Sequence, residues 1–463
     1  MTLPARASGD EGVSRPEAAI RRSDSDRRER RGGLRGRLNL FQAMVLRWRE
    51  LHPYVAVHMI GVPHPLEAAR LKEAIGGRLE EAGLARIELD RLRRRFEFRP
   101  GPAAVELRVL SAGSDPHEAV RAEIERQLNG AFPSEGTFTP FRFFVVDRGP
   151  AFDLGVAYDH FIAGGDSIAV LLERLFEAYA PGESKRAAPW APRRYPGTYR
   201  RLFLRDFGHS LRGLARLPAM AASCRRSARA PCHTDRPATE AFLCYGVPER
   251  EFSALLRTAK AWGVTVNDLV LAMLLLALAS VVPRRDGDRR NELGVASIVN
   301  LRREFESDAK ETFGLFLASL RISHAVPSGV ELRRLAGDVH AETERIKKEK
   351  LYLQTLLGLG WTAIAWRFLS PERRRRFLAK HYPIWAGVTS LNIDPLWTET
   401  ALSRTALEYV RAVPTGPLAP LAFAITTFRG RMQVGVSYRI ADLSADTARR
   451  VADALLGLMH GLG

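Results

Sequence analysis

One stretch of the chain, residues 152–179, changes its period of apolar positions midway. Up to residue 157 apolar and polar or small side chains alternate, which predicts a strand. From residue 168 the apolar side chains recur at helical spacing, which predicts an amphipathic helix. The turn between them carries polar and small residues, namely His160, Gly164, Gly165, Asp166 and Ser167. Either Asp166 or Ser167 can cap the helix by accepting hydrogen bonds from its free N–H groups.

The same patterns divide the remaining chain into two halves, each mixing strands with helices. In the first half they predict helices near 38–51, 65–81 and 116–129, and strands near 54–60, 86–90, 94–98, 105–110 and 141–146. In the second half they predict strands near 240–247, 293–300, 315–323, 385–393, 406–412, 420–428 and 431–440. Helices are predicted near 248–262, 265–282, 328–349 and 351–381, and Ser444 caps a last one. This order is typical of an α+β fold with mixed sheets.

The length of 463 residues exceeds one ordinary compact core and predicts two subdomains. We expect a disordered basic tail over 1–37, because it has no apolar period. An N-terminal lobe over 38–183 and a C-terminal lobe over 238–463 then flank a Pro- and Arg-rich linker over 184–237.

The net charge of +18 is unevenly distributed. Residues 1–37 hold ten Arg and six acids, a net +4, and residues 184–237 hold thirteen Lys plus Arg and two acids, a net +11. The two lobes therefore carry little of the charge. No zinc-finger, RNA-binding or basic heptad pattern occurs, so we expect no nucleic-acid partner.

Within the linker, residues 199–217 can form a helix with one apolar and one basic face. Its apolar face holds Phe203, Phe207, Leu211 and Leu214, and its basic face Arg201, Arg205, Arg212 and Arg216. Such a helix either lies on an anionic membrane or packs on the body as a crossover with its arginines in water. The sequence leaves both interpretations open.

Composition also bears on membrane insertion, secretion and metal binding. No run of 18 uninterrupted apolar residues occurs, and the apolar stretch near 269–282 predicts a buried helix. No secretory signal is visible, and Cys224, Cys232 and Cys244 fit neither a metal cage nor a disulfide framework. We expect a cytoplasmic protein without a metal, at the inner face of the membrane if the basic helix binds lipid.

His160 is the candidate catalytic residue because of its place at a strand-to-helix break. A neutral imidazole accepts a proton near pH 7, and a turn can expose it to a cleft. The alternative is a structural or surface histidine, which is the commoner role.

The turn resembles the His-x-x-x-Asp-Gly motif of the CoA-dependent acyltransferase superfamily. This group includes chloramphenicol acetyltransferase, peptide-synthetase condensation domains, plant acyltransferases and wax ester synthase/diacylglycerol acyltransferases. His160 matches the motif histidine and Gly165 its glycine. Gly164 stands in place of the aspartate, and Asp159 stands where several families carry a second histidine.

Further segments resemble elements of these families in the same order. Residues 264–272 are similar to a Thr-Val-Asn-Asp helix start that Thr265 or Asn267 caps, and 299–302 to an Asn-Leu-Arg element. Residues 313–316 lie where a Gly-Asn pair is usual, and 390–394 are similar to a Ser-Asn-Val strand. The resemblance spans 38–463.

This resemblance implies a two-lobed chloramphenicol acetyltransferase-like fold with a tunnel between the lobes. It implies transfer of an acyl group from a CoA or carrier-protein thioester to a hydroxyl or amine, with His160 as general base and no bound cofactor. Ser390 or Asn392 would donate to the oxyanion or line the tunnel. The motif aspartate would pair with an arginine and shape the turn, and Asp166, or next Asp159, would replace it here.

The departures from the motif support a second hypothesis. Asp159, Gly164 and Leu391 replace expected residues, as in a catalytically inactive homologue that acts as a binding or scaffold protein. Thioester consumption with and without His160 separates the two hypotheses.

Overall fold

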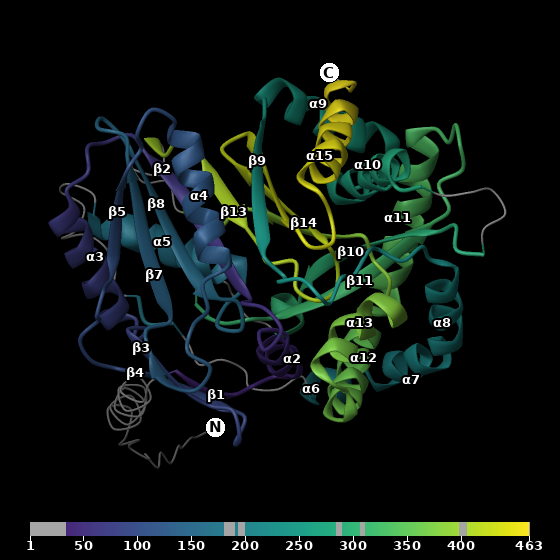
Figure 1. The fold of residues 1–463 in the computed structure, drawn as a ribbon, viewed down its shortest axis with the longest axis horizontal. Coiled ribbons are helices and arrows are strands. Elements are labelled where there is room, and N and C mark those ends of the chain that lie inside the picture. The colour runs from purple at the N-terminus through teal and green to yellow at the C-terminus, as the bar shows by residue number, and fades with distance from the viewer. Residues whose placement is uncertain are drawn as a thin grey trace, which may run out of the picture.

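The computed structural model describes residues 34–179, 190–192, 200–283, 289–305, 311–397 and 405–462. Most of the predicted tail, residues 1–33, the end of the predicted N-terminal lobe, 180–183, and two segments at the start of the linker, 184–189 and 193–199, lie outside the described residues. The chain forms two lobes that lie side by side, each with its own sheet (Figure 1).

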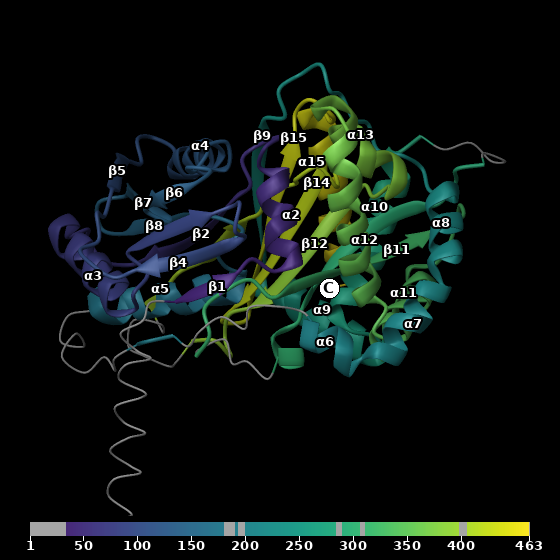
Figure 2. The same cartoon turned by 90° about the horizontal axis from the view of Figure 1, so that it is seen from below.

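The first lobe is built on a five-stranded sheet in the order β13-β2-β8-β7-β5. Only β5 and β7 run parallel, and the other pairs are antiparallel. Helix α4 covers one face of this sheet, and α3 and α5 lie on the opposite face (Figure 2). The bounds are β2 Val55–Val62, β5 Leu107–Ser111, β7 Phe141–Asp147, β8 Phe152–Asp159 and β13 Tyr409–Ala412. The helices are α2 Leu40–Trp48, α3 Ala68–Glu81, α4 Pro116–Leu128 and α5 Gly165–Tyr179.

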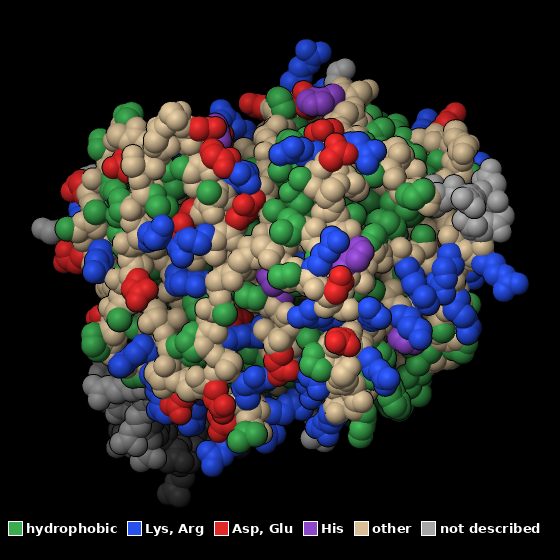
Figure 3. Space-filling view, viewed as in Figure 1, with side chains coloured by type: hydrophobic (Ala, Val, Ile, Leu, Met, Phe, Trp, Pro, Cys, Tyr) green, Lys and Arg blue, Asp and Glu red, His purple; other side chains and the backbone are tan. Residues whose placement is uncertain are grey.

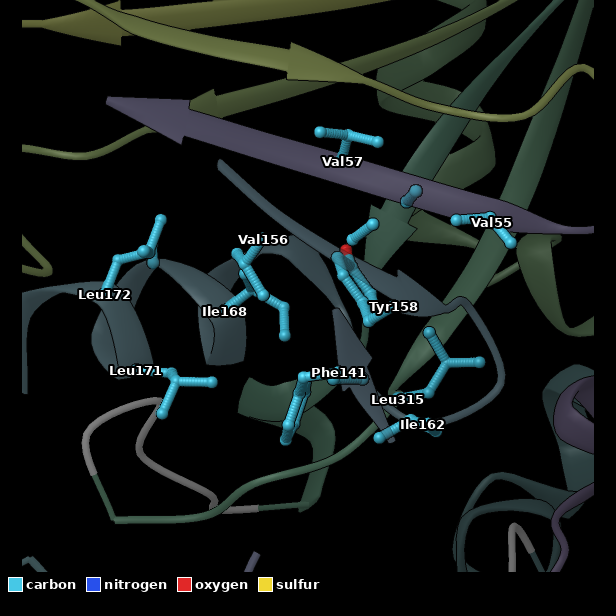
Figure 4. Close-up of a cluster of buried hydrophobic side chains, with 14 of the residues drawn as sticks. Val55, Val57, Phe141, Val156, Tyr158, Ile162, Ile168, Leu171, Leu172 and Leu315 are labelled. Carbon is cyan, nitrogen blue, oxygen red and sulfur yellow. The ribbon is translucent and has the colours of Figure 1, made fainter. Parts of the chain in front are cut away.

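Apolar side chains from β2, β7, β8 and α5 form the core of this lobe, and Leu315 joins them from the second half of the sequence (Figure 4). Every residue of β8 is buried. The predicted strand and helix that flank His160 are therefore both present, and they fix the two ends of its turn.

A smaller antiparallel sheet, in the order β1-β4-β3-β6, lies beside this core. Its strands are β1 Arg35–Arg37, β3 Arg86–Asp90, β4 Arg95–Arg99 and β6 Gly136–Phe138. The expected end of the disordered tail at residue 37 is wrong, because β1 pairs with β4 and Leu34 and Leu38 are buried. Three residues are too few to show a period, so no sequence pattern predicts this strand.

The second lobe is built on a six-stranded sheet in the order β11-β10-β12-β14-β15-β9, whose central strands β10, β12 and β14 are parallel. Thr265 caps α10 in a capping box with Asp268, and the helix is buried for most of its length. The strands are β9 Glu240–Val247, β10 Leu293–Asn300, β11 Leu317–His324, β12 Ala386–Asn392, β14 Leu421–Phe428 and β15 Arg431–Arg439. The helices are α9 Glu249–Trp262, α10 Val266–Val281, α11 Leu332–Lys348, α12 Tyr352–Ala365, α13 Pro371–His381 and α15 Ala445–His460, with short 3₁₀ turns η1 Arg302–Phe305 and η2 Trp366–Phe368.

The two halves of the sequence do not map one-to-one onto the two sheets. Strand β13 belongs to the second half but pairs with β2 of the first lobe, with Tyr409 opposite Ile60. Phe313, Leu315 and Phe316 are also buried in the first-lobe core. These two crossings place C-terminal residues directly beside the His160 turn.

The linker region forms three short helices, α6 Arg200–Arg205, α7 Phe207–Ala215 and α8 Leu217–Arg226, where one helix over 199–217 was expected. Contacts with the body favour the crossover alternative: Arg205 pairs with Glu304, and Arg216 with Glu349. Phe207, Leu211 and Leu214 nevertheless remain exposed. Lipid binding by this region therefore stays a prediction.

The surface and the helix lengths add two observations on charge and apolarity. In the view of Figure 3, Lys and Arg lie among acidic side chains over most of the face and gather with few acidic neighbours at its right-hand edge. Within the described ranges, no single helix is long and apolar enough to cross a membrane; α9 and α10 pass that test only as a pair bent by 103°.

Candidate active site

His160 follows β8 directly and lies in the turn that leads to α5. Its backbone N–H donates to the carbonyl oxygen of Tyr54 at 2.9 Å. The imidazole stacks on the ring of Tyr54, with centroids 5.6 Å apart, and meets Tyr158 edge to face at 5.9 Å. Two aromatic rings and a backbone hydrogen bond therefore hold the side chain in one place.

The hydrogen bonds of His160 determine which ring nitrogen is the base. Nδ1 lies 3.1 Å from the carbonyl oxygen of Ala163, which can only accept, so Nδ1 carries the proton in the neutral ring. Nε2 is then the atom that can accept a proton. Burial lowers the pKa of His160 to about 4, so the imidazole is neutral at pH 7.

A cavity of about 260 Å³ lies beside His160 at the junction of the two lobes. Its walls come from both lobes and are mostly apolar or aromatic; they include Phe41, Tyr54, Tyr158, Phe377 and Leu421. No Asp, Glu or Lys of the described chain lines it, and Arg411 is the arginine on its wall. Such a cavity suits an apolar acyl group and excludes much of the water around His160.

Asp166 has the basic partner that the motif comparison led us to expect. Its Oδ2 accepts from Asn300 Nδ2 at 2.8 Å and from Arg302 Nε, and its Oδ1 lies 3.2 Å from Arg302 Nη2. Both side chains of the ion pair are buried. Asn300 and Arg302 belong to the element that resembles Asn-Leu-Arg, so this element contacts the His160 turn through Asp166.

The Arg302 guanidinium also connects the turn to the segment after η1. It donates to the carbonyl oxygens of Thr312 at 2.6 Å and Gly314 at 3.2 Å, and to Ser167 Oγ. Ser167 Oγ in turn accepts from the backbone N–H of Gly314 at 3.1 Å. Ser167 is thus bound within the structure, consistent with a structural role.

The two glycines of the turn lie close to the side chains of Asp166, Arg411 and His58. A Cβ on Gly164 would lie 3.0 Å from Asp166 Oδ1, and a Cβ on Gly165 would lie 3.2 Å from Arg411 Nη1 and 3.4 Å from His58 Cε1. The N–H of Gly164 donates to the Gly314 carbonyl oxygen at 3.0 Å. Gly164 therefore leaves room for the Asp166 carboxylate, and Gly165 for the groups at the cavity.

Asp159, in the position of the second motif histidine, forms a separate buried ion pair with Arg49. Arg49 also donates to the carbonyl oxygens of Phe132 and Pro133, both at 2.6 Å. Burial raises the pKa of Asp159 to about 6 despite the arginine. This residue does not contact Arg302, so of the two candidates for the motif aspartate only Asp166 has that partner.

Ser390 and Asn392 are not where the oxyanion hypothesis needs them. Both are exposed and neither lines the cavity. Side chains alternate along a strand, so Ser390 points toward α10 and donates to Asn267 Oδ1 at 3.1 Å, while Leu391 lies close to Gly165. The expectation that they lie beside the tunnel is therefore corrected. The polar residue of β12 that lines the cavity is Thr389.

His58 and Arg411 also line the cavity, and neither was predicted as a site residue. His58 Nδ1 lies 2.8 Å from the hydroxyl of Tyr409, and Tyr158 Oη lies 3.4 Å from Nε2. The sequence pattern that could have indicated them is a His or Arg inside an otherwise apolar strand. Ionisable side chains are rarely buried unless they have a partner or a function.

The described residues contain no group of three or more His, Cys, Asp or Glu that could hold a metal ion. The ionisable groups at the centre of the site are the half-buried His160, the buried His58 and Arg411, and aromatic side chains surround them.

Comparisons with known proteins find this fold in solved structures. The first condensation domain of the calcium-dependent antibiotic synthetase aligns over 92% of this chain and 96% of its own, at 18% identity and a TM-score of 0.64. The epimerization domain of the third module of tyrocidine synthetase B aligns over 93% and 98%, at 16% identity and 0.63. Polyketide synthase associated protein 5 from Mycobacterium tuberculosis aligns over 90% and 96%, at 13% identity and 0.60.

These alignments confirm the predicted two-lobed fold of condensation domains and related proteins. No protein-family profile matches the chain, and no curated protein matches it by sequence. At these identities the likeness establishes the fold alone, so the chemistry has to be argued from the site.

Proposed function

We propose that this protein transfers an acyl group from a thioester to a hydroxyl or amine acceptor. The observation that carries the proposal is His160, a half-buried neutral imidazole with its Nδ1 proton bound to Ala163, on the wall of a mostly apolar cavity between two lobes. The donor thioester is carried either by CoA or by a carrier protein. The solved condensation domain of the same fold, described with a substrate analogue, gives this reaction class additional support.

In this proposal His160 Nε2 removes the proton of the acceptor hydroxyl or amine as that atom attacks the thioester carbonyl. The carbonyl oxygen becomes an oxyanion, and its collapse expels the thiolate, which takes up the proton that His160 removed. The protein contributes a fixed base and a cavity that brings acyl group and acceptor together, which lowers the entropic cost of their encounter. No covalent bond to the enzyme forms.

The test is thioester consumption by the purified protein over a panel of acyl-CoA and acyl-carrier donors with amine and alcohol acceptors. His160→Ala should lower turnover about 10²–10⁴-fold, the usual contribution of a positioned general base. His381→Ala is the matched control, because His381 lines the same cavity but lies at its exposed side, and it should leave turnover nearly unchanged. Full activity in a folded His160→Ala protein would move the site elsewhere.

The pH profile of the wild-type enzyme is a second readout. A base with a pKa of about 4 is unprotonated above that pH, so kcat/KM should stay level from pH 8 down to about pH 5.5 and fall below it. A histidine with an ordinary pKa would already lose activity near pH 6.5. An acid limb near that value would contradict a base with a lowered pKa.

The alternative is a catalytically inactive homologue that binds an acyl group or scaffolds a partner. The changed positions Asp159 and Gly164 favour it. It predicts no thioester consumption with any donor, and identical behaviour of wild type and His160→Ala.

A further inference from the structure

Arg411 is a buried cation on the cavity wall whose charge no carboxylate neutralises by direct contact. Only 3% of the residue is exposed, and no ion pair to it exists in the described chain. It lies on β13, the strand that the second half contributes to the first-lobe sheet. A buried, unpaired charge is costly, so a compensating group is expected.

Part of the guanidinium has a structural role. Nε donates to Thr426 Oγ1 at 2.9 Å, and Nη2 donates to the carbonyl oxygens of Thr389 at 2.9 Å and Ile425 at 2.8 Å. These bonds attach β13 to strands β12 and β14 of the second lobe. They account for Nε and Nη2 and leave Nη1 without a hydrogen-bond partner among the described residues.

Nη1 is on the side of the guanidinium that faces the His160 turn. It lies 3.2 Å from the position that a Cβ on Gly165 would take, and Gly165 lines the cavity together with Arg411 and His160. Gly165 is also the first residue of α5, and the N-terminal end of a helix adds a partial positive charge. His58 lies close to the same position and is neutral, because burial lowers its pKa far below its usual value, and the Asp166 carboxylate that also acts on Arg411 is already paired with Arg302.

We infer that Arg411 binds the carboxylate of the acceptor substrate, which is therefore an amino acid or hydroxy acid presented as a free acid. A single arginine in a wall without Lys, Asp or Glu matches one negative charge, and Nη1 offers two N–H groups for a charge-assisted hydrogen bond. With the carboxylate at Arg411, the amine or hydroxyl of a short acid lies toward His160 on the same cavity wall. The acceptor role rests on the proposed function; the preference for an anion does not.

The first test measures binding and needs no turnover. The probes are 4-phenylbutyrate and its neutral isostere 4-phenylbutyramide, titrated into the full-length protein by calorimetry at pH 7. The acid should bind about 10- to 100-fold more tightly than the amide, the range for a hydrogen bond to a charged group. Equal affinities in the wild-type protein overturn the inference, whatever any variant does.

Variants then assign the preference to Arg411. Arg411→Gln should remove it, and Arg411→Lys, which keeps the charge if the glutamine variant does not fold, should retain part of it. Arg321→Gln is the matched control, because Arg321 also donates to a backbone carbonyl oxygen, that of Pro383, but does not line the cavity. An acid preference that survives in Arg411→Gln contradicts the inference.

His160→Ala separates this inference from the proposed function. The variant should keep the acid preference, because the anion contacts Arg411 and not the base. If turnover is found, Arg411→Gln should lower kcat/KM more for acidic acceptors than for neutral ones, chiefly by raising KM for the acids. An equal loss with both kinds of acceptor would assign Arg411 to the oxyanion or to the fold instead of to the acceptor.

Discussion

Two buried carboxylates flank the candidate base, and the structure holds them in different ways. Asp166, after His160, contacts Asn300 and Arg302, and through Arg302 it reaches the backbone at Thr312 and Gly314. Asp159, before His160, contacts Arg49, whose other bonds go to the loop at Phe132 and Pro133. The first pair joins the turn to the second half of the chain, whereas the second pair stays within the first lobe.

This difference shows how a motif position can be lost without losing its contact. Gly164 cannot supply a carboxylate, but Asp166 is two residues further along, at the first turn of α5. The missing side chain at Gly164 leaves the space that the Asp166 carboxylate needs, since a Cβ there would lie 3.0 Å from Oδ1. Arg302 therefore keeps an acidic partner, and the carboxylate comes from position 166 instead of position 164.

The largest effect is expected when Asp166 is neutralised. Asp166→Asn leaves the buried Arg302 without its counter-ion, and breaking a buried ion pair from one side should lower the free energy of unfolding by about 3 kcal/mol. Turnover should fall as well, because the pair fixes the turn that carries His160. Chemical denaturation and the thioester assay measure the two effects. If Asp159→Asn is the more harmful substitution, the comparison between the two pairs is reversed.

A smaller effect is expected when the carboxylate is restored at the motif position. Gly164→Asp should destabilise the protein by about 2 kcal/mol, because the new Cβ and charge crowd Asp166. The backbone itself tolerates the change, since Gly164 is not among the residues with positive φ. Arg302 is present to receive the new side chain.

The double variant Gly164→Asp/Asp166→Asn provides the decisive control for that substitution. If the two positions deliver a carboxylate to the same arginine, the double variant should be more stable than the sum of the single costs predicts, by about 1–2 kcal/mol. Strictly additive costs would show that position 164 does not reach Arg302.

Asp159→Asn should have a milder effect that depends on pH. The pKa of Asp159 is about 6 in the folded protein, above the ordinary value of 3.8, so folding favours its protonated form. The wild-type protein therefore loses stability as pH rises from about 4 through 6, and the asparagine variant does not. The cost of the substitution should be largest near pH 4 and should shrink toward pH 7, where we expect about 1 kcal/mol or less. Denaturation of both proteins at several pH values checks this; a cost that grows with pH contradicts it.

The sequence predicted the elements with strong periods but not the pairings between distant residues. β8, α5 and the Thr265-capped α10 follow from periodicity and capping chemistry. By contrast, His58 and Tyr409 are separated by 351 residues, so no local pattern indicates their contact. Arg411 reaches the site for the same reason, because the pairing of β13 with β2 is decided by tertiary packing.

The Ser390 and Asn392 hypothesis failed for a different reason. The strand was predicted correctly, but the side of the sheet that each residue faces depends on its register, and a shift of one residue exchanges the two faces. The resemblance of 390–394 to a known strand could not fix that register.

The smallest effect is expected when the N-terminal tail is deleted. This deletion serves as a control for the substitutions in the two carboxylate pairs. Deletion of residues 1–33 should leave the thermal midpoint unchanged, because this segment has no apolar period that would bury a face. Deletion through residue 37 should differ, since it also removes β1 and the buried Leu34, at a cost of about 2 kcal/mol for one leucine returned to water. Of the deleted segment, the described residues 34–37 make no hydrogen bond or ion pair with Asp159 or Asp166, so we expect both deletions to keep the difference between Asp166→Asn and Asp159→Asn. Thermal unfolding of the two deletion variants tests the boundary: equal midpoints would show that β1 adds no stability, and a drop with the shorter deletion would show that residues 1–33 pack on the body.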